Sequence, residues 1–91
     1  MALFLIERNF VEEQVIDPES EFAGQIREVN DDVGIRWIYS YLSADKRKTY
    51  CLYEAPDPEA IREAARRLDL PADVIIQVDS PIGPQGAVQV A

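Results

Sequence analysis

Apolar and polar positions along the chain follow two periodicities, which divide it into strands and helices. Short apolar, β-branched or aromatic runs typical of strands occupy 3–6, 35–42, 48–54 and 74–78. Between them, apolar residues recur three and four positions apart, as on one face of a helix, at 22–33 and 61–68. The predicted order is strand, helix, strand, strand, helix, strand.

Capping residues predict where the two helices begin and end. Asp17-Pro18-Glu19 and Asp57-Pro58-Glu59 each place an Asp before a Pro and an acid, which is a helix start. Gly34 stands where the first helix needs a left-handed residue, and Pro71 is expected to end the second. The polar turn at 43–47 is short, so the two strands beside it should form an antiparallel hairpin.

Two strand–helix–strand units with right-handed crossovers predict a ferredoxin-like α+β fold, βαββαβ. Its four-stranded antiparallel sheet carries both helices on one face, in a single domain spanning residues 1–79. Residues 80–91 hold two prolines and two glycines, and we interpret them as a tail or arm outside the core. Val88 and Val90 alternate, so this arm is also a candidate edge strand for a partner.

The predicted fold leaves one sheet face without helices. Trp37, Tyr39 and Tyr41 share one side of the second strand if it alternates regularly. Because helices pack well on small and aliphatic side chains, we expect this aromatic row on the uncovered face. By similar reasoning, the third strand should point its Tyr50 and Leu52 towards the helices.

Thr49, Cys51 and Tyr53 should then point outward from the third strand. A face with four large aromatic rings is too apolar to remain in water. It should be covered by a second copy, by the arm or by a ligand. We expect a homodimer of the α/β-barrel type, with the two sheets packed face to face.

Composition and charge exclude several classes of protein. The chain has 91 residues, of which 47% are hydrophobic, and a net charge of −8. It lacks the basic surface that nucleic acids and anionic membranes require, so neither is an expected partner. No apolar run is long enough to cross a membrane. The single cysteine forms no internal disulfide and suits a reducing compartment, which favours the cytoplasm.

Metal chemistry is poorly supported, because histidine is absent. Cys51 is the one soft ligand besides Met1, and one thiolate is not a metal site. A symmetric dimer that pairs two thiols, with Glu7 or tyrosines completing the set, stays open beside the simpler interpretation of Cys51 as a small hydrophobic residue. We expect no metal and no cofactor.

A candidate ligand site combines the outward aromatic residues with a thiol and a strand carboxylate. Its members are Glu7, Trp37, Tyr39, Tyr41, Cys51 and Tyr53. Aromatic walls with a few polar tips are typical of small-molecule pockets. The same rings suit a dimer interface, where Tyr and Trp are enriched, and both interpretations can hold. The basic run 46–48 lacks the glycines of an RNA-recognition strand and is expected to be a solvated turn.

The favoured function is a small cytoplasmic homodimeric binding module. The alternative is a small cofactor-independent enzyme that uses an acid and tyrosines between the sheets. The chain has no Ser/His/Asp set, no glycine-rich phosphate loop and no paired-cysteine motif. Glu7 is the candidate general base, because a partner would desolvate its carboxylate. An open pocket into which Glu7 or Glu54 points would favour the enzyme.

The hairpin and second helix carry a more specific pattern. It comprises Trp37, Ser40-Tyr41, Ser43, Asp45-Lys46-Arg47-Lys48-Thr49, Tyr50-Cys51, Tyr53 and Ala55-Pro56-Asp57-Pro58-Glu59-Ala60-Ile61-Arg62. In these residues the chain resembles a family of small domains of unknown function, some described as nickel-binding, over about residues 3 to 79. The resemblance implies a ferredoxin-like fold, often paired into a dimer with facing sheets. Similar sequences often carry His where this chain has Tyr39, so a nickel site built from imidazoles cannot form here.

Overall fold

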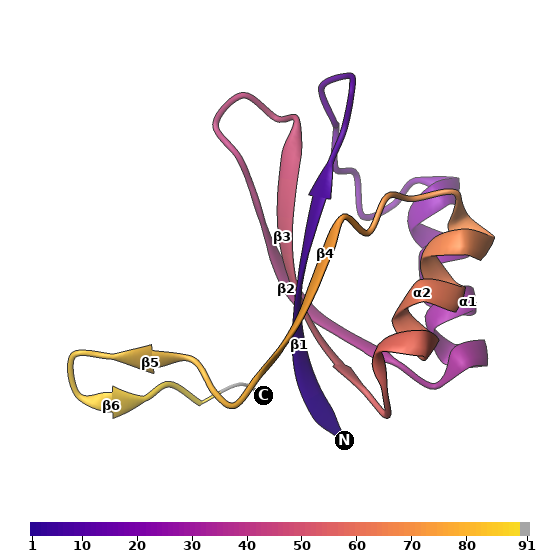
Figure 1. The fold of residues 1–91 in the computed structure, drawn as a ribbon. Helices are drawn as coiled ribbons and strands as arrows, with labels where there is room; N and C mark the ends of the chain where they lie inside the picture. The colour runs from indigo at the N-terminus through magenta and orange to yellow at the C-terminus, as the bar shows by residue number, and fades with distance from the viewer. Residues whose placement is uncertain (90–91) are drawn as a thin grey trace.

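The computed structural model describes residues 1–89 (Figure 1). Its elements, in chain order, are β1 (Ala2–Asn9), α1 (Glu21–Val33), β2 (Arg36–Leu42), β3 (Lys48–Ala55), α2 (Pro58–Leu68), β4 (Val74–Val78), β5 (Ile82–Gly83) and β6 (Gly86–Ala87). The first six follow the predicted order. The last two form a small hairpin in the segment expected to be a tail or arm.

The main sheet has the order β2-β3-β1-β4, and all neighbouring strands run antiparallel. Both helices lie on the same side of it (Figure 1). This arrangement confirms the ferredoxin-like α+β fold. β1 continues past Glu7 and Arg8 to Asn9, because it is a central strand with partners on both sides.

The core lies between the sheet and the helices. Even-numbered residues of β1, odd-numbered residues of β3 and one face of α2 form it, together with Ile35. The largest fully buried side chains are Phe4, Ile6 and Ile61. An alternating strand pattern and a helical pattern therefore meet in one apolar layer, as the fold requires.

The helix ends confirm part of the capping prediction. α2 begins as expected, with Asp57 accepting a hydrogen bond from the Ala60 N–H at 2.9 Å. Gly34 adopts the predicted left-handed conformation, with φ of 76°. α2 nevertheless stops at Leu68, before Pro71, because Asp69 is already left-handed with φ of 54°.

The predicted start of α1 at Asp17 is wrong. The helix begins at Glu21, and Ser20 caps it by accepting a hydrogen bond from the Ala23 N–H at 3.1 Å. Asp17 instead stabilises the preceding turn, in which its Oδ1 accepts from the Glu19 N–H at 3.0 Å. Two sets of capping residues follow one another here, and the later one prevails.

The predicted aromatic row on β2 is only partly correct. An irregularity in the pairing with β3 lies between Trp37 and Tyr39, and it breaks the simple alternation. Tyr39 and Tyr41 lie on the face without helices, as expected. Trp37 lies on the helix side, where its ring stacks on Tyr53 with centroids 6.5 Å apart.

The prediction for β3 is wrong on every residue. Thr49, Cys51 and Tyr53 are buried on the helix side, and Cys51 and Tyr53 belong to the core. Tyr50 and Leu52 lie on the opposite face, because they pair with Tyr41 and Tyr39 across the ladder. Directly paired residues share a face, so the register with β2 determines the orientation of all of β3.

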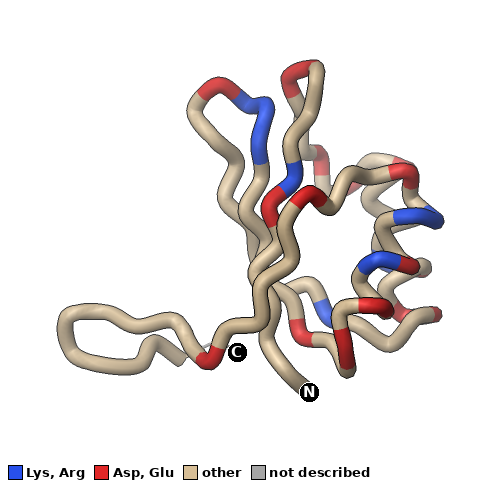
Figure 2. Tube along the Cα trace, in the orientation of Figure 1, with Lys and Arg blue, Asp and Glu red and all other residues tan. Residues whose placement is uncertain are grey.

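The arm, residues 80–89, extends from the end of β4 on the side of the sheet opposite the helices (Figure 1). Its hairpin is closed by pairing of β5 with β6 and by a hydrogen bond from the Val88 N–H to the Pro81 carbonyl at 2.8 Å. The arm contains no charged residue, as its uniform colour in Figure 2 shows. Val90, the other half of the alternating pair, lies outside the described residues.

Candidate functional site

The structure separates the six predicted site residues into two groups on opposite sides of the sheet. Glu7, Tyr39 and Tyr41 belong to the face without helices, which we call the open face. Trp37, Cys51 and Tyr53 line a cavity on the helix side, which we call the inner cavity. A single site containing all six residues is therefore not formed within one chain.

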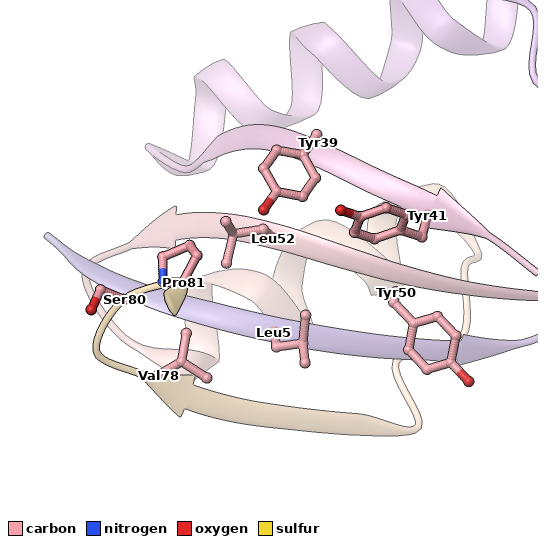
Figure 3. A pocket seen from close by; sticks show the side chains of 8 residues that line it. All are labelled: Leu5, Tyr39, Tyr41, Tyr50, Leu52, Val78, Ser80 and Pro81. Carbon is pink, nitrogen blue, oxygen red and sulfur yellow. The ribbon is translucent and has the colours of Figure 1, made fainter. Parts of the chain in front are cut away.

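The open face is an apolar surface with a shallow groove (Figure 3). The groove encloses about 180 Å³ and is lined by Leu5, Tyr39, Tyr41, Tyr50, Leu52, Val78, Ser80 and Pro81. Tyr39 and Tyr41 meet edge to face, with ring centroids 5.7 Å apart. The base of the arm closes one end of the groove, so the arm and the open face form one continuous surface.

The apolar surface extends across the whole sheet. On β4, Val74 and Ile76 point to the open face, because they pair with Glu7 and Leu5 of β1. Ile76 is 50% exposed and Tyr41 is 67% exposed. Large apolar side chains at both edges of the sheet are thus in contact with water in the isolated chain.

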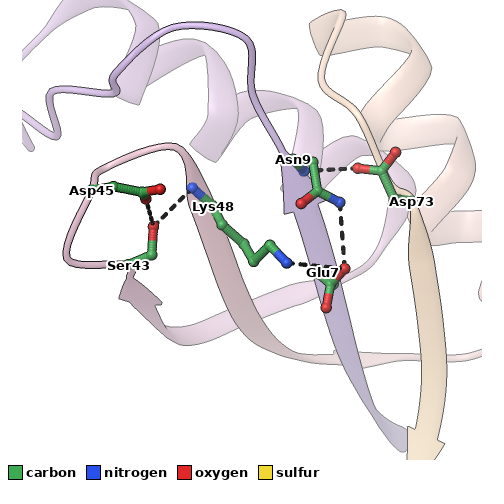
Figure 4. A network of polar contacts seen from close by, with 6 residues as sticks. All are labelled: Glu7, Asn9, Ser43, Asp45, Lys48 and Asp73. Carbon is green, nitrogen blue, oxygen red and sulfur yellow. Dashed lines mark hydrogen bonds and ion pairs between the residues drawn. The ribbon is translucent and has the colours of Figure 1, made fainter.

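The strand carboxylates of the open face are engaged in ion pairs and lie outside the groove. Glu7 accepts a hydrogen bond from Asn9 Nδ2 at 3.3 Å and lies 3.7 Å from Lys48 Nζ (Figure 4). Glu54 accepts from Arg36 Nε at 2.7 Å, and this bond lowers the pKa of its carboxyl. Neither acid is held as a proton acceptor facing a pocket.

The turn between β2 and β3 has its own polar network (Figure 4). Ser43 donates to Asp45 Oδ1 at 2.6 Å and accepts from the Lys48 backbone N–H at 3.0 Å. The bond from Ser43 is the main reason why the pKa of Asp45 is lowered. Lys46 and Arg47 are exposed, and Lys46 has φ of 63°. Lys46 and Arg47 therefore lie in a solvated turn, as expected, whereas Lys48 already belongs to β3 and pairs with Glu7.

The inner cavity lies between the helix side of the sheet, α1 and the loop that follows β1. It encloses about 170 Å³. Its floor consists of the buried residues Arg8, Thr49, Cys51 and Tyr53. Its rim consists of the exposed apolar residues Ile16, Phe22, Trp37 and Leu42. Phe10, Gln14, Ile26, Ser40 and Leu70 complete the wall.

Arg8 is the residue that sequence reasoning missed. It is only 5% exposed, although it is an arginine. Its Nη1 donates to the Pro71 carbonyl at 2.6 Å, and its Cζ lies 6.0 Å from the centre of the Tyr53 ring. Period-two alternation from Phe4 and Ile6 would have placed Arg8 on the core face.

Tyr53 and Thr49, which line the inner cavity with Arg8, carry hydroxyl groups. Burial raises the pKa of the Tyr53 hydroxyl, and contacts with Arg8 and Asn30 only partly oppose this. The Cys51 thiol donates to Thr49 Oγ1 at 3.6 Å, so it is a buried core group and does not reach the open face. Trp37 Nε1 donates to Ser40 Oγ at 2.8 Å, which positions the indole at the rim.

Metal ligands are not brought together in the part of the chain that the structure describes. Within residues 1–89, no group of three or more His, Cys, Asp or Glu side chains could hold a metal ion. The alternative in which two Cys51 thiols pair across facing open faces is wrong, because the thiol lies in the core on the other side of the sheet. No helix of residues 1–89 is long and apolar enough to span a membrane.

Comparison with known proteins agrees with the fold. The crystal structure of SCO4226 from Streptomyces coelicolor A3(2) matches with a TM-score of 0.71 and 22% sequence identity, covering 85% of this chain and 95% of that one. No protein with a curated description matches the chain. The model of the family described as nickel responsive protein SCO4226-like matches residues 4–78. The chain therefore belongs to the SCO4226-like family.

Proposed function

We propose that this protein is a homodimeric binding module whose two copies pack through their open faces. The observation that carries the proposal is the apolar surface formed by Tyr39, Tyr41, Val74 and Ile76, all of which are exposed in one chain. A contiguous apolar patch of this kind normally marks an interface. A two-fold axis would cover both patches with one self-complementary contact.

Charge supports pairing between two copies despite the net charge of −8. On the open face, Glu7 is paired with Lys48 and Glu54 with Arg36, so each acid is accompanied by a base. Acidic residues elsewhere lie mainly on the helices and loops (Figure 2). Repulsion between two copies is therefore weakest at this face. The same overall charge disfavours nucleic acid as a partner.

The arm supports the same interface. A two-stranded hairpin is at best marginally stable alone in water. Its Ile82 is 81% exposed and its Val88 is 49% exposed. Since the arm extends on the open-face side, a second copy packed there would lie in the angle between arm and sheet, where it would bury these side chains.

The enzyme alternative has no comparable support. Neither Glu7, the candidate general base, nor Glu54, the other strand carboxylate, lines the groove or the inner cavity. Both accept hydrogen bonds from neighbouring side chains. We therefore retain the binding module, and we propose a cytoplasmic location because a free thiol suits a reducing compartment.

Sedimentation velocity over a concentration series tests the dimer. We expect the mass of two chains at micromolar concentration, with dissociation on dilution. A protein that remains monomeric throughout this range contradicts the proposal. The two states are easily distinguished, because one chain has a mass of 10.3 kDa and the dimer has twice that mass.

Nickel binding is a separate question, raised by the description of the family. The chain has no histidine, and its one thiol is buried against Thr49. Nickel is bound well by imidazole and thiolate ligands. Because this chain has no imidazole and its one thiol is buried, its side chains do not fit a nickel site. We therefore expect calorimetric titration with Ni²⁺ to show no site of micromolar or tighter affinity. A tight site that is lost in Cys51→Ala would overturn this prediction.

A further inference from the structure

The inner cavity contains the buried, positively charged Arg8, which has no carboxylate partner among the described residues. Within residues 1–89, no carboxylate oxygen lies within 4.0 Å of the Arg8 guanidinium, and the ion pairs that do form involve other bases. Arg8 donates to a backbone carbonyl and contacts the ring and hydroxyl of Tyr53, and both of these partners are uncharged groups. A buried charge is normally paired, since its desolvation is otherwise uncompensated.

We propose that the inner cavity binds a small organic carboxylate, with Arg8 as the residue that holds its carboxylate group. The guanidinium presents several N–H donors in a planar fork that matches a carboxylate. One of these donors is used by Pro71. Thr49 and Tyr53 beside it carry hydroxyl groups that can add a further hydrogen bond.

The size and walls of the cavity define the rest of the ligand. The volume is about 170 Å³, and an apolar cavity of roughly 150 Å³ accepts a molecule of the size of benzene. Phe22, Trp37 and Leu42 surround the entrance with apolar surface. The fitting ligand therefore has one carboxylate and one ring or short alkyl chain, with the acid end inside and the apolar end towards the rim.

The site is independent of the proposed dimer, because the inner cavity and the open face are on opposite sides of the sheet. Trp37 is the only tryptophan of the chain and stands at the rim, so it reports on occupancy directly. Failure of ligand binding would leave the dimer untouched. Failure of the dimer would equally leave the cavity and Arg8 in place.

Titration of the full-length protein with benzoate tests the site, and benzamide is the matched probe, since it has the same shape and no charge. We expect benzoate to change Trp37 fluorescence saturably and to bind at least about tenfold more tightly than benzamide, which corresponds to ~1.4 kcal/mol. In amide-resolved NMR, shifts should concentrate on Arg8, Trp37 and Thr49. The amides of Leu5 and Tyr41 on the open face should not respond.

Two substitutions separate a binding role from a structural one. Arg8→Gln should abolish the preference for benzoate, while Arg8→Lys should retain part of it. Arg27→Gln is the control, because Arg27 also donates to a proline carbonyl but is exposed on α1. If Arg8→Gln fails to fold, Cys51→Met serves instead, since the longer side chain fills part of the cavity and should weaken benzoate binding.

Several results would overturn the proposal. The first is equal affinity for benzoate and benzamide. The second is a lack of saturation below about 10 mM benzoate, because a specific site of this size should bind more tightly than that. The third is NMR shifts confined to the open face. Retained preference in folded Arg8→Gln, unchanged affinity in Cys51→Met, or an equal loss in Arg27→Gln would do the same.

Discussion

Replacing Tyr41 and Ile76 together with glutamate should convert the protein into a monomer. Both side chains are exposed in one chain and would be buried between two open faces. Burying an unpaired carboxylate in an apolar interface costs several kcal/mol. We expect the dissociation constant of the dimer to rise by at least about 1,000-fold, which is ~4 kcal/mol. Sedimentation velocity measures the change.

The matched control adds the same charge elsewhere. Val11 and Val15 are 92% and 88% exposed in the loop after β1, so Val11→Glu with Val15→Glu makes the chain equally more acidic. This control should remain dimeric. If both double variants dissociate equally, net charge and not the open face controls assembly. If neither dissociates, the interface lies elsewhere on the molecule.

Replacing Phe4 with alanine should destabilise the fold by about 3–5 kcal/mol. Phe4 is 2% exposed and lies on the central strand between Tyr53 and Gln77 of its two neighbours. Its removal leaves a cavity that rigid sheet neighbours on both sides cannot fill. For a domain with a total stability of roughly 5–15 kcal/mol, much of the stability would be lost. Urea unfolding measures the change.

Phe22→Ala removes the same atoms from a different environment. Phe22 is 43% exposed at the rim of the inner cavity, so its loss should cost below about 1.5 kcal/mol. Both variants must be compared at one protein concentration, because dimer formation adds concentration-dependent stability. Equal losses from the two phenylalanines would mean that β1 does not direct its even-numbered residues into the core.

The sequence predicted the elements and their arrangement well, because local patterns carry that information. Apolar residues three and four apart located both helices, and Asp57-Pro58 located the start of α2. The hairpin followed from two β-branched, aromatic runs around a polar turn. The start of α1 was misplaced because Asp17 and Ser20 are both competent caps, and propensity alone does not choose between them.

The candidate site was predicted less well, because it depends on which face each strand residue occupies. The aromatic spacing correctly placed Tyr39 and Tyr41 on the open face. The same spacing placed Trp37 on the open face, because strict alternation of side chains puts residues 37, 39 and 41 on one side of a strand. The irregularity between Trp37 and Tyr39 breaks that alternation. Such an irregularity reverses the faces of a strand without a clear signal in the local sequence.

Composition, charge and periodicity thus determined by themselves that this chain is an acidic ferredoxin-like domain with one uncovered apolar sheet face. Only the tertiary structure decided that Cys51 and Tyr53 belong to the core and that Arg8 is buried beside them. The physical reason is register. Pairing of Tyr39 with Leu52 places Cys51 and Tyr53 on the helix side of β3, and pairing of Arg8 with Thr49 places Arg8 on that same side. The pairing of β2 with β3 joins residues of two strands, so no pattern within β3 alone specifies which of its faces is buried.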